Sequence, residues 1–269
     1  IIAESAVTRP DIITVRKFLE AHEKKVGQTA PMELAFGILD YDSGDEKAGE
    51  AALQQALKLD PKYSAAHYTL GNIYFRKGMT DEADKEFKLA AELAPKRSPR
   101  RLSYANFKIQ TGDVAEGKRL MAEITKEAPD YIPAWIRQAE IALAEQRYDD
   151  CESLLNNALA HDTDNYDALF LRARMYLARG KVDKGVTELS RLSALYDQSP
   201  EVFYQLGVAE AATKDFSKAV TALNRALFLR PKYPEATMLL ASLSISKGDT
   251  GAAITSLTLL LKDYPRYAQ

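Results

Sequence analysis

Residues 66–74 read Ala-His-Tyr-Thr-Leu-Gly-Asn-Ile-Tyr, and residues 202–208 read Val-Phe-Tyr-Gln-Leu-Gly-Val. The glycines of the two stretches, Gly71 and Gly207, stand 136 residues apart, which is four steps of 34. A step of 34 residues also aligns many other positions of like character along the chain. A constant period of this length is typical of solenoids built from stacked helical units.

Two of the aligned columns hold small residues, and a third holds large apolar ones. The first small column is Gly37, Gly71, Ala105, Ala139, Ala173, Gly207 and Ala241. The second is Gly49, Ala83, Gly117, Cys151, Gly185, Ala219 and Ala253. The large column is Leu53, Phe87, Met121, Leu155, Leu189, Leu223 and Leu257. Small residues on two helices allow their backbones to approach closely, and the large residue fills the space beside the contact. The columns therefore predict pairs of packed helices.

Two further columns mark the connections between helices. A column rich in proline follows the second helix of each pair, where proline cannot continue it: Pro61, Pro95, Pro129, Thr163, Asp197, Pro231 and Pro265. A glycine column lies between the two helices, where a turn needs positive φ: Gly44, Gly78, Gly112, Gly180 and Gly248. Gln146 and Lys214 stand in the glycine column and Asp197 in the proline column, and we expect them to loosen individual turns.

The pattern resembles the tetratricopeptide repeat, whose 34-residue signature is W-x₂-L-G-x₂-Y…A-x₃-F…P. The best copy comprises Leu70, Gly71, Tyr74, Ala83, Phe87, Ala90 and Pro95. The signature tryptophan occurs once, as Trp135. The resemblance implies an all-α fold, a right-handed α-solenoid of antiparallel helix pairs. It covers residues 30–267 as seven consecutive repeats, which we expect to form a single solenoid domain.

Both ends of the sequence suggest that the array continues. Residues 1–29 read as the remains of a truncated preceding repeat, with its second helix at about residues 10–26 and its first helix surviving as Ile1 to Val7. The last repeat ends on an apolar helix with no polar capping helix after it, which solenoids need for solubility. We expect the chain to be a piece of a longer protein, or its uncapped ends to allow self-association.

Composition excludes several function classes. The formal net charge of −2 gives no overall attraction to nucleic acid, and no aromatic array is interleaved with the basic clusters. No run of about 18 apolar residues is present, so we expect no membrane span. With one cysteine, no internal disulfide can form. A cytoplasmic location is open, as is a bacterial periplasmic or outer-membrane one if a preceding segment carries a lipoprotein signal.

No catalytic or ligand-binding motif is found, and we expect no enzyme, no cofactor and no metal site. The segment Gly44-Asp45-Glu46-Lys47-Ala48-Gly49 lacks the Lys-Ser/Thr of a phosphate loop. The histidines His22, His67 and His161 lack metal-ligand spacing. Cys151 occupies a small-residue column, which favours a packed thiol over a nucleophile.

In the family, the first helices of the pairs line the surface to which partners bind. Mapped onto this sequence, the resemblance implies an apolar and aromatic groove with a polar seam. The candidate partner-binding residues are Tyr68, Asn72, Phe75, Asn106, Arg137, Glu140, Phe170, Arg174 and Tyr204. An exposed apolar surface of this extent usually marks a binding face, although such side chains can also pack on one another.

Some relatives hold a peptide's C-terminal carboxylate with Lys, Asn and Arg side chains. Asn72 and Arg137 match that arrangement, whereas Tyr68, Pro133 and Ser103 replace its other members. The first interpretation is thus a protein-interaction scaffold or adaptor that binds a partner peptide or helix in the groove. Alternatives are an assembly module of a bacterial envelope, exopolysaccharide-export or secretion complex, and an accessory array beside a catalytic domain elsewhere in the protein.

Overall fold

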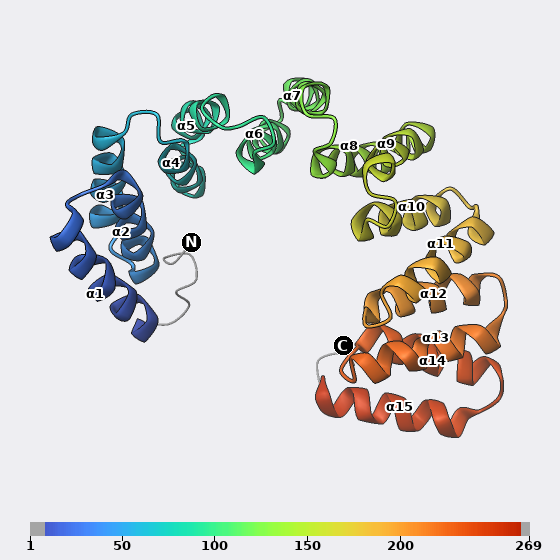
Figure 1. Ribbon diagram of the computed structural model, residues 1–269. Coiled ribbons are helices and arrows are strands. Elements are labelled where there is room, and N and C mark those ends of the chain that lie inside the picture. The colour runs from blue at the N-terminus through green and yellow to red at the C-terminus, as the bar shows by residue number, and fades with distance from the viewer. Residues whose placement is uncertain (1–8, 265–269) are drawn as a thin grey trace. The chain divides into compact units, whose positions relative to one another are not determined.

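The computed structural model describes residues 9–264, which fold into helices joined by short turns (Figure 1). The fold is all-α, as the sequence predicts. The first helix, α1, spans Arg9–Val26, where the second helix of a truncated repeat is predicted. The predicted first helix of that repeat, at Ile1 to Val7, lies outside the described residues, as does Pro265.

The remaining described helices form pairs, each with a first and a second helix. The pairs are α2 (Ala30–Ser43) with α3 (Glu46–Leu59), α4 (Ser64–Arg76) with α5 (Thr80–Glu92), α6 (Pro99–Gln110) with α7 (Val114–Glu127), α8 (Ile132–Ala144) with α9 (Tyr148–His161), α10 (Tyr166–Ala178) with α11 (Val182–Leu195), α12 (Pro200–Ala212) with α13 (Phe216–Leu229), and α14 (Pro234–Ser246) with α15 (Thr250–Asp263). Two compact units contain them, Ile1–Tyr131 and Ile132–Gln269.

Within a pair, the helices touch through the two small columns. Ala83 on α5 is fully buried, and a Cβ added to Gly71 on α4 would lie 2.8 Å from Phe87 Cδ1. A Cβ on Gly117 of α7 would lie 2.7 Å from the carbonyl oxygen of Ala105 on α6. Neither position has room for a side chain, so the small columns set the distance between the helices of a pair.

Acidic side chains begin several second helices. The carboxylate of Asp45 accepts a hydrogen bond of 3.0 Å from the backbone N–H of Ala48 at the start of α3. Asp113 and Asp215 cap α7 and α13 in the same way. These side chains satisfy backbone N–H groups that have no partner within the helix, and their charge suits its N-terminal dipole.

The turns of the glycine column keep one conformation even where glycine is replaced. Gly112 and Gly180 have φ values of 94° and 78°, and Gln146 and Lys214 have 59° and 65°. The expectation that Gln146 and Lys214 loosen their turns is therefore wrong, because the backbone at both residues keeps the positive φ of the glycine turns. The neighbouring helices hold both residues in the left-handed region, which disfavours side chains with a Cβ.

This strain predicts opposite effects of two substitutions. Gln146→Gly should raise the free energy of unfolding by about 1 kcal/mol, because it removes the left-handed penalty, partly offset by the greater entropy of the unfolded chain. Gly180→Gln should lower it by about as much, because a Cβ there meets nothing within 4 Å and the cost is purely conformational. Urea unfolding of both variants checks this, and equal stabilities would contradict it.

Candidate functional site

A pocket of about 270 Å³ opens on the face of the first helices α4 and α6. The residues that line it are Asn72, Phe75, Phe87, Ser103, Asn106, Phe107 and Gln110. Only Phe87 comes from a second helix, α5. It reaches the pocket because it follows the close contact at Gly71, where its ring fills the space beside the glycine. The pocket thus combines one complete helix pair with the first helix of the next.

Three phenylalanine rings form the apolar part of this pocket. The centroid of Phe107 lies 5.2 Å from that of Phe75 in an edge-to-face arrangement and 4.9 Å from that of Phe87. Phe87 and Phe107 are buried, whereas Phe75 is 37% exposed. Tyr68 packs against Phe87 from outside the pocket, with ring centroids 5.8 Å apart. Aromatic pairs at these distances stabilise one another beyond the area they bury.

The polar part of the pocket consists of amide and hydroxyl groups. The side-chain amide of Asn72 donates a hydrogen bond of 2.9 Å to the carbonyl oxygen of Tyr68, which orients it on its own helix. Asn106 lies at the same repeat position one pair later, and Ser103 and Gln110 lie one turn on either side of it. None of the side chains that line the pocket is ionisable, so its polar groups are uncharged hydrogen-bond donors and acceptors.

The structure therefore brings together three of the nine predicted groove residues: Asn72, Phe75 and Asn106. Of the residues in the second unit, Arg137 and Glu140 pair with each other at 2.8 Å on α8. Phe170 stacks on Tyr166 at 5.6 Å, and Tyr204 packs on Tyr233 at 5.0 Å. Arg174 is exposed on α10. For Phe170 and Tyr204 the described contacts are thus packing contacts.

The sequence did not identify four residues that line the pocket. Phe87 was assigned to the core column, and Phe107 stands in a column with Leu39, Ile73, Ile141, Met175, Ala209 and Leu243. Phe87 and Phe107 are each the one aromatic residue in an otherwise non-aromatic column. This departure is the sequence signal by which both could have been found. Ser103 stands out in the sequence only as a departure from the carboxylate-binding arrangement, and no sequence signal marks Gln110.

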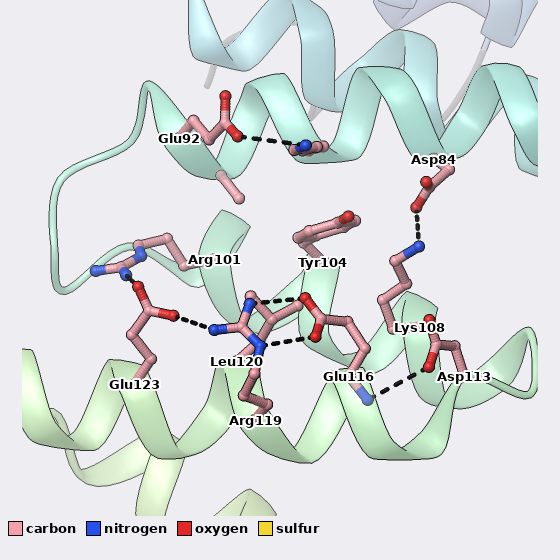
Figure 2. Close-up of a pocket in the computed structure, with 12 residues that line it drawn as sticks. Asp84, Glu92, Arg101, Tyr104, Lys108, Asp113, Glu116, Arg119, Leu120 and Glu123 are labelled. Carbon is pink, nitrogen blue, oxygen red and sulfur yellow. Dashed lines mark hydrogen bonds and ion pairs between the residues drawn. The ribbon is translucent and has the colours of Figure 1, made fainter.

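A second cavity, of about 500 Å³, lies between α5, α6 and α7 and is lined by charged side chains (Figure 2). These charges are paired with one another. Lys108 contacts Asp84 at 2.7 Å, which joins α6 to α5. Arg119 pairs within α7 with Glu116 at 2.7 Å and Glu123 at 3.0 Å. The walls carry four cationic and five acidic side chains, and each of the cations forms an ion pair with an acidic residue.

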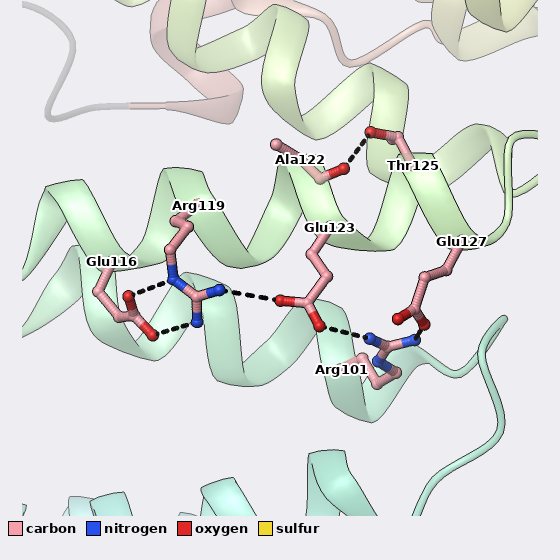
Figure 3. Close-up of polar contacts among 7 residues, drawn as sticks. All are labelled: Arg101, Glu116, Arg119, Ala122, Glu123, Thr125 and Glu127. Carbon is pink, nitrogen blue, oxygen red and sulfur yellow. Dashed lines mark hydrogen bonds and ion pairs between the residues drawn. The ribbon is translucent and has the colours of Figure 1, made fainter.

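Arg101 connects α6 to α7 at one end of this cavity (Figure 3). It contacts Glu127 at 2.7 Å and Glu123 at 3.8 Å, and its side chain is 16% exposed. The hydrogen bond from the Arg101 guanidinium, together with its positive charge, lowers the pKa of the Glu127 carboxyl group. Arg119, in contrast, is 59% exposed, and its ion pairs with Glu116 and Glu123 both lie within α7.

This difference predicts unequal effects of two matched substitutions. Arg101→Met should lower the free energy of unfolding, because it removes the ion pairs through which a largely buried guanidinium joins α6 to α7. Arg119→Met should lower it less, as exposed pairs within one helix contribute little. Urea unfolding at two salt concentrations measures both. An equal loss would contradict the assignment of Arg101 as the connection between α6 and α7.

His67 joins α4 to α5 and to the turn that precedes α4. Its Nδ1 lies 2.6 Å from a carboxylate oxygen of Glu86 on α5, and its Nε2 lies 3.1 Å from the carbonyl oxygen of Pro61. Both partners accept hydrogen bonds, so the protonated imidazolium satisfies both. The hydrogen bond to Glu86 raises the pKa of His67 against the opposing effect of burial, and the Pro61 carbonyl and the charge of Asp60 add to the rise.

A raised pKa in the folded state makes stability depend on pH. The contribution of His67 is fully present below the pKa of the unfolded histidine, near 6.5, and is lost as pH rises through the folded pKa. The wild type should therefore lose stability between about pH 6 and about pH 9 relative to His67→Gln, which does not titrate. Urea unfolding at both pH values tests this. Parallel pH profiles of the two proteins would refute it.

Across residues 9–264, no three or more His, Cys, Asp or Glu side chains gather where they could hold a metal ion. Burial raises the pKa of the Cys151 thiol to about 11, which keeps it protonated at neutral pH. No helix among the described residues is long and apolar enough to cross a membrane.

Comparison with known families agrees with the repeat pattern. Two profiles of the tetratricopeptide repeat match the chain, one at residues 41–100 and 142–206 and the other at residues 200–243. Together they cover more than half of it. The chain belongs to the tetratricopeptide repeat family. Repeats of this family form protein-interaction scaffolds and are generally non-catalytic, and proteins that contain them generally bind other proteins.

Relatives of this tetratricopeptide array include proteins from animals and bacteria. Human tetratricopeptide repeat protein 21B is 28% identical over 96 residues, or 34% of this chain. Cellulose synthase 1 operon protein C of Komagataeibacter xylinus is 25% identical over 173 residues, or 60% of this chain. The chain spans only 7% and 13% of the lengths of these two relatives.

Solved structures share the fold at low sequence identity. Yeast Tom70 matches 94% of this chain and 55% of its own, with a TM-score of 0.64 and 16% identity. A tetratricopeptide repeat protein from Parabacteroides merdae matches 87% of this chain and 92% of its own, with a TM-score of 0.61 and 14% identity. MamA matches 61% of this chain and 96% of its own, with a TM-score of 0.56 and 17% identity. These likenesses show the solenoid fold alone.

Proposed function

We propose that the array binds a peptide or helical segment of a partner protein on the face of its first helices, with the α4–α6 pocket at the centre of the contact. The observation that carries this proposal is the meeting of Asn72, Phe75 and Asn106, with the buried rings of Phe87 and Phe107, around one open pocket. Concave sites with an apolar base and a few polar groups are the usual form of binding sites.

The energetics of the pocket favour binding over packing as the role of Phe75. Its ring is 37% exposed although the edge contact to Phe107 is already made. Covering the remaining apolar surface contributes about 25 cal/mol per Å². The amide groups of Asn72 and Asn106 can both donate and accept hydrogen bonds, which suits the N–H and C=O groups of a peptide backbone. The charged cavity lacks this combination, because most of its lining side chains are charged and its cations are held in ion pairs.

The proposal predicts that binding depends on the pocket residues and not on the outer surface. Peptides selected from a random phage-displayed library on the wild-type chain should bind the triple variant Asn72→Ala, Phe75→Ala, Asn106→Ala at least about tenfold more weakly, a loss of about 1.4 kcal/mol. The helical circular dichroism signal should be unchanged, because the three side chains are exposed or half-buried. Isothermal titration calorimetry measures the affinities.

A matched control replaces three exposed residues of second helices, as Lys85→Ala, Glu92→Ala and Lys126→Ala. This variant should bind the same peptides as tightly as the wild type. If the pocket variant retains wild-type affinity while the control variant loses it, the partner binds the second helices and the proposal fails.

A second candidate function is assembly within a bacterial envelope or exopolysaccharide-export complex. It is favoured by the match of 60% of this chain to cellulose synthase 1 operon protein C, whose name places it with a polysaccharide synthase. The two functions are compatible, since assembly also requires partner binding. Fractionation of cells that express the full natural protein tests the second one. Recovery outside the envelope fraction, with unchanged export when the gene is deleted, would reject it.

A further inference from the structure

The chemistry of the α4–α6 pocket narrows the partner beyond the proposed function, on which this inference rests. We propose that the pocket binds the side chain of one aromatic residue in an uncharged, internal stretch of the partner. It does not hold a charged side chain or a C-terminal carboxylate. Three properties support the proposal: the arrangement of the rings, the volume of the pocket and the absence of ionisable groups from its lining.

The phenylalanine rings that line the pocket form an aromatic cluster with space beside it for one more ring. Phe107 contacts Phe87 on one side and Phe75 on the other, with centroid distances of 4.9 and 5.2 Å. Phe87 in turn contacts Tyr68. These distances fall within the range of about 4.5–7 Å at which aromatic rings attract one another. A further ring in the pocket would meet the accessible ring of Phe75 in the same way.

The volume fits one side chain rather than a larger ligand. The pocket measures about 270 Å³. A cavity of about 150 Å³ accommodates benzene, whereas pockets for drug-sized molecules usually measure about 300–1,000 Å³. An indole or phenol ring therefore fits, together with part of the backbone that carries it.

The residues that line the pocket disfavour the binding of a charged side chain. Asn72, Ser103, Asn106 and Gln110 provide amide and hydroxyl groups, and the other lining residues are phenylalanines. An ammonium or carboxylate group that entered would lose hydration without gaining an opposite charge. The amides can instead hydrogen-bond an uncharged peptide backbone on either side of the bound ring.

Capped amino acids test the pocket without a known partner. The probes are N-acetyl-tryptophanamide, N-acetyl-phenylalaninamide, N-acetyl-lysinamide and N-acetyl-phenylalanine, whose carboxylate is free. Titrations followed by the side-chain amide NMR signals of Asn72, Asn106 and Gln110 should saturate with the two aromatic amides. We expect affinities at least about fivefold higher than for the lysine amide or the free carboxylate, a difference that desolvation of a charge readily supplies. Equal affinity for all four probes would overturn the proposal.

Two variants and a control locate the effect. Ser103→Phe should fill the pocket and abolish the shifts, whereas Gln205→Phe adds the same ring at the same repeat position in the second unit and should leave them unchanged. Gln110→Lys changes an exposed residue at the edge of the pocket and should increase binding of N-acetyl-phenylalanine. Unchanged binding in both Ser103→Phe and Gln110→Lys would place the probes elsewhere and refute the assignment.

The outcome is separable from that of the proposed function. If the probes bind the pocket but library peptides are insensitive to the triple variant, the proposed function fails while the pocket assignment stands. If library peptides require Asn72, Phe75 and Asn106 but place a charged residue there, the aromatic selectivity alone is wrong.

Discussion

The close approach of the two helices in each pair is the constraint on which the rest of the structure depends. At Gly71 and at Gly117, a single added carbon would come within 2.8 Å and 2.7 Å of atoms on the partner helix. Two helices packed this closely can rotate or slide very little relative to each other. A given position of the repeat is therefore found in a similar environment in each pair. The large apolar column lies next to the contact, and most of its described members are fully buried.

The candidate site is a local consequence of that constraint. The other six members of the large column are Leu or Met, and Leu53 and Leu223 lie beside the glycine of the first helix in their own pair. Phe87 is larger and reaches beyond its pair to the ring of Phe107 on the next first helix, 4.9 Å away. Phe107 in turn replaces an aliphatic residue found at the same position in the other repeats. The pocket therefore forms where these substitutions coincide with the accessible ring of Phe75.

The sequence predicts the helices and turns because their causes recur at every step of 34 residues. The resemblance to the tetratricopeptide repeat also implies that Asn72, Phe75 and Asn106 share the face of the first helices, because they stand at groove positions of two consecutive repeats. The roles of Phe87 and Phe107 were not predicted, because periodicity assigns a residue to the core without saying how far a larger side chain extends. The turns at Gln146 and Lys214 show the converse, since the packing of the flanking helices imposes the glycine conformation on residues that disfavour it.

Helix α6 lines both the pocket and the charged cavity. Its helical periodicity places charged side chains on the cavity side and uncharged ones on the pocket side. Arg101, Tyr104 and Lys108 follow one another at helical spacing and line the charged cavity, where both cations are paired with acidic residues of the neighbouring second helices. Ser103, Asn106, Phe107 and Gln110 lie on the other side and line the uncharged pocket. The ion pairs thus fix α6 on the side away from the pocket, and the pocket side can remain free of charge. A partner bound on the pocket side, as we propose, would therefore be distinguished by shape, ring contacts and hydrogen bonds rather than by electrostatic attraction.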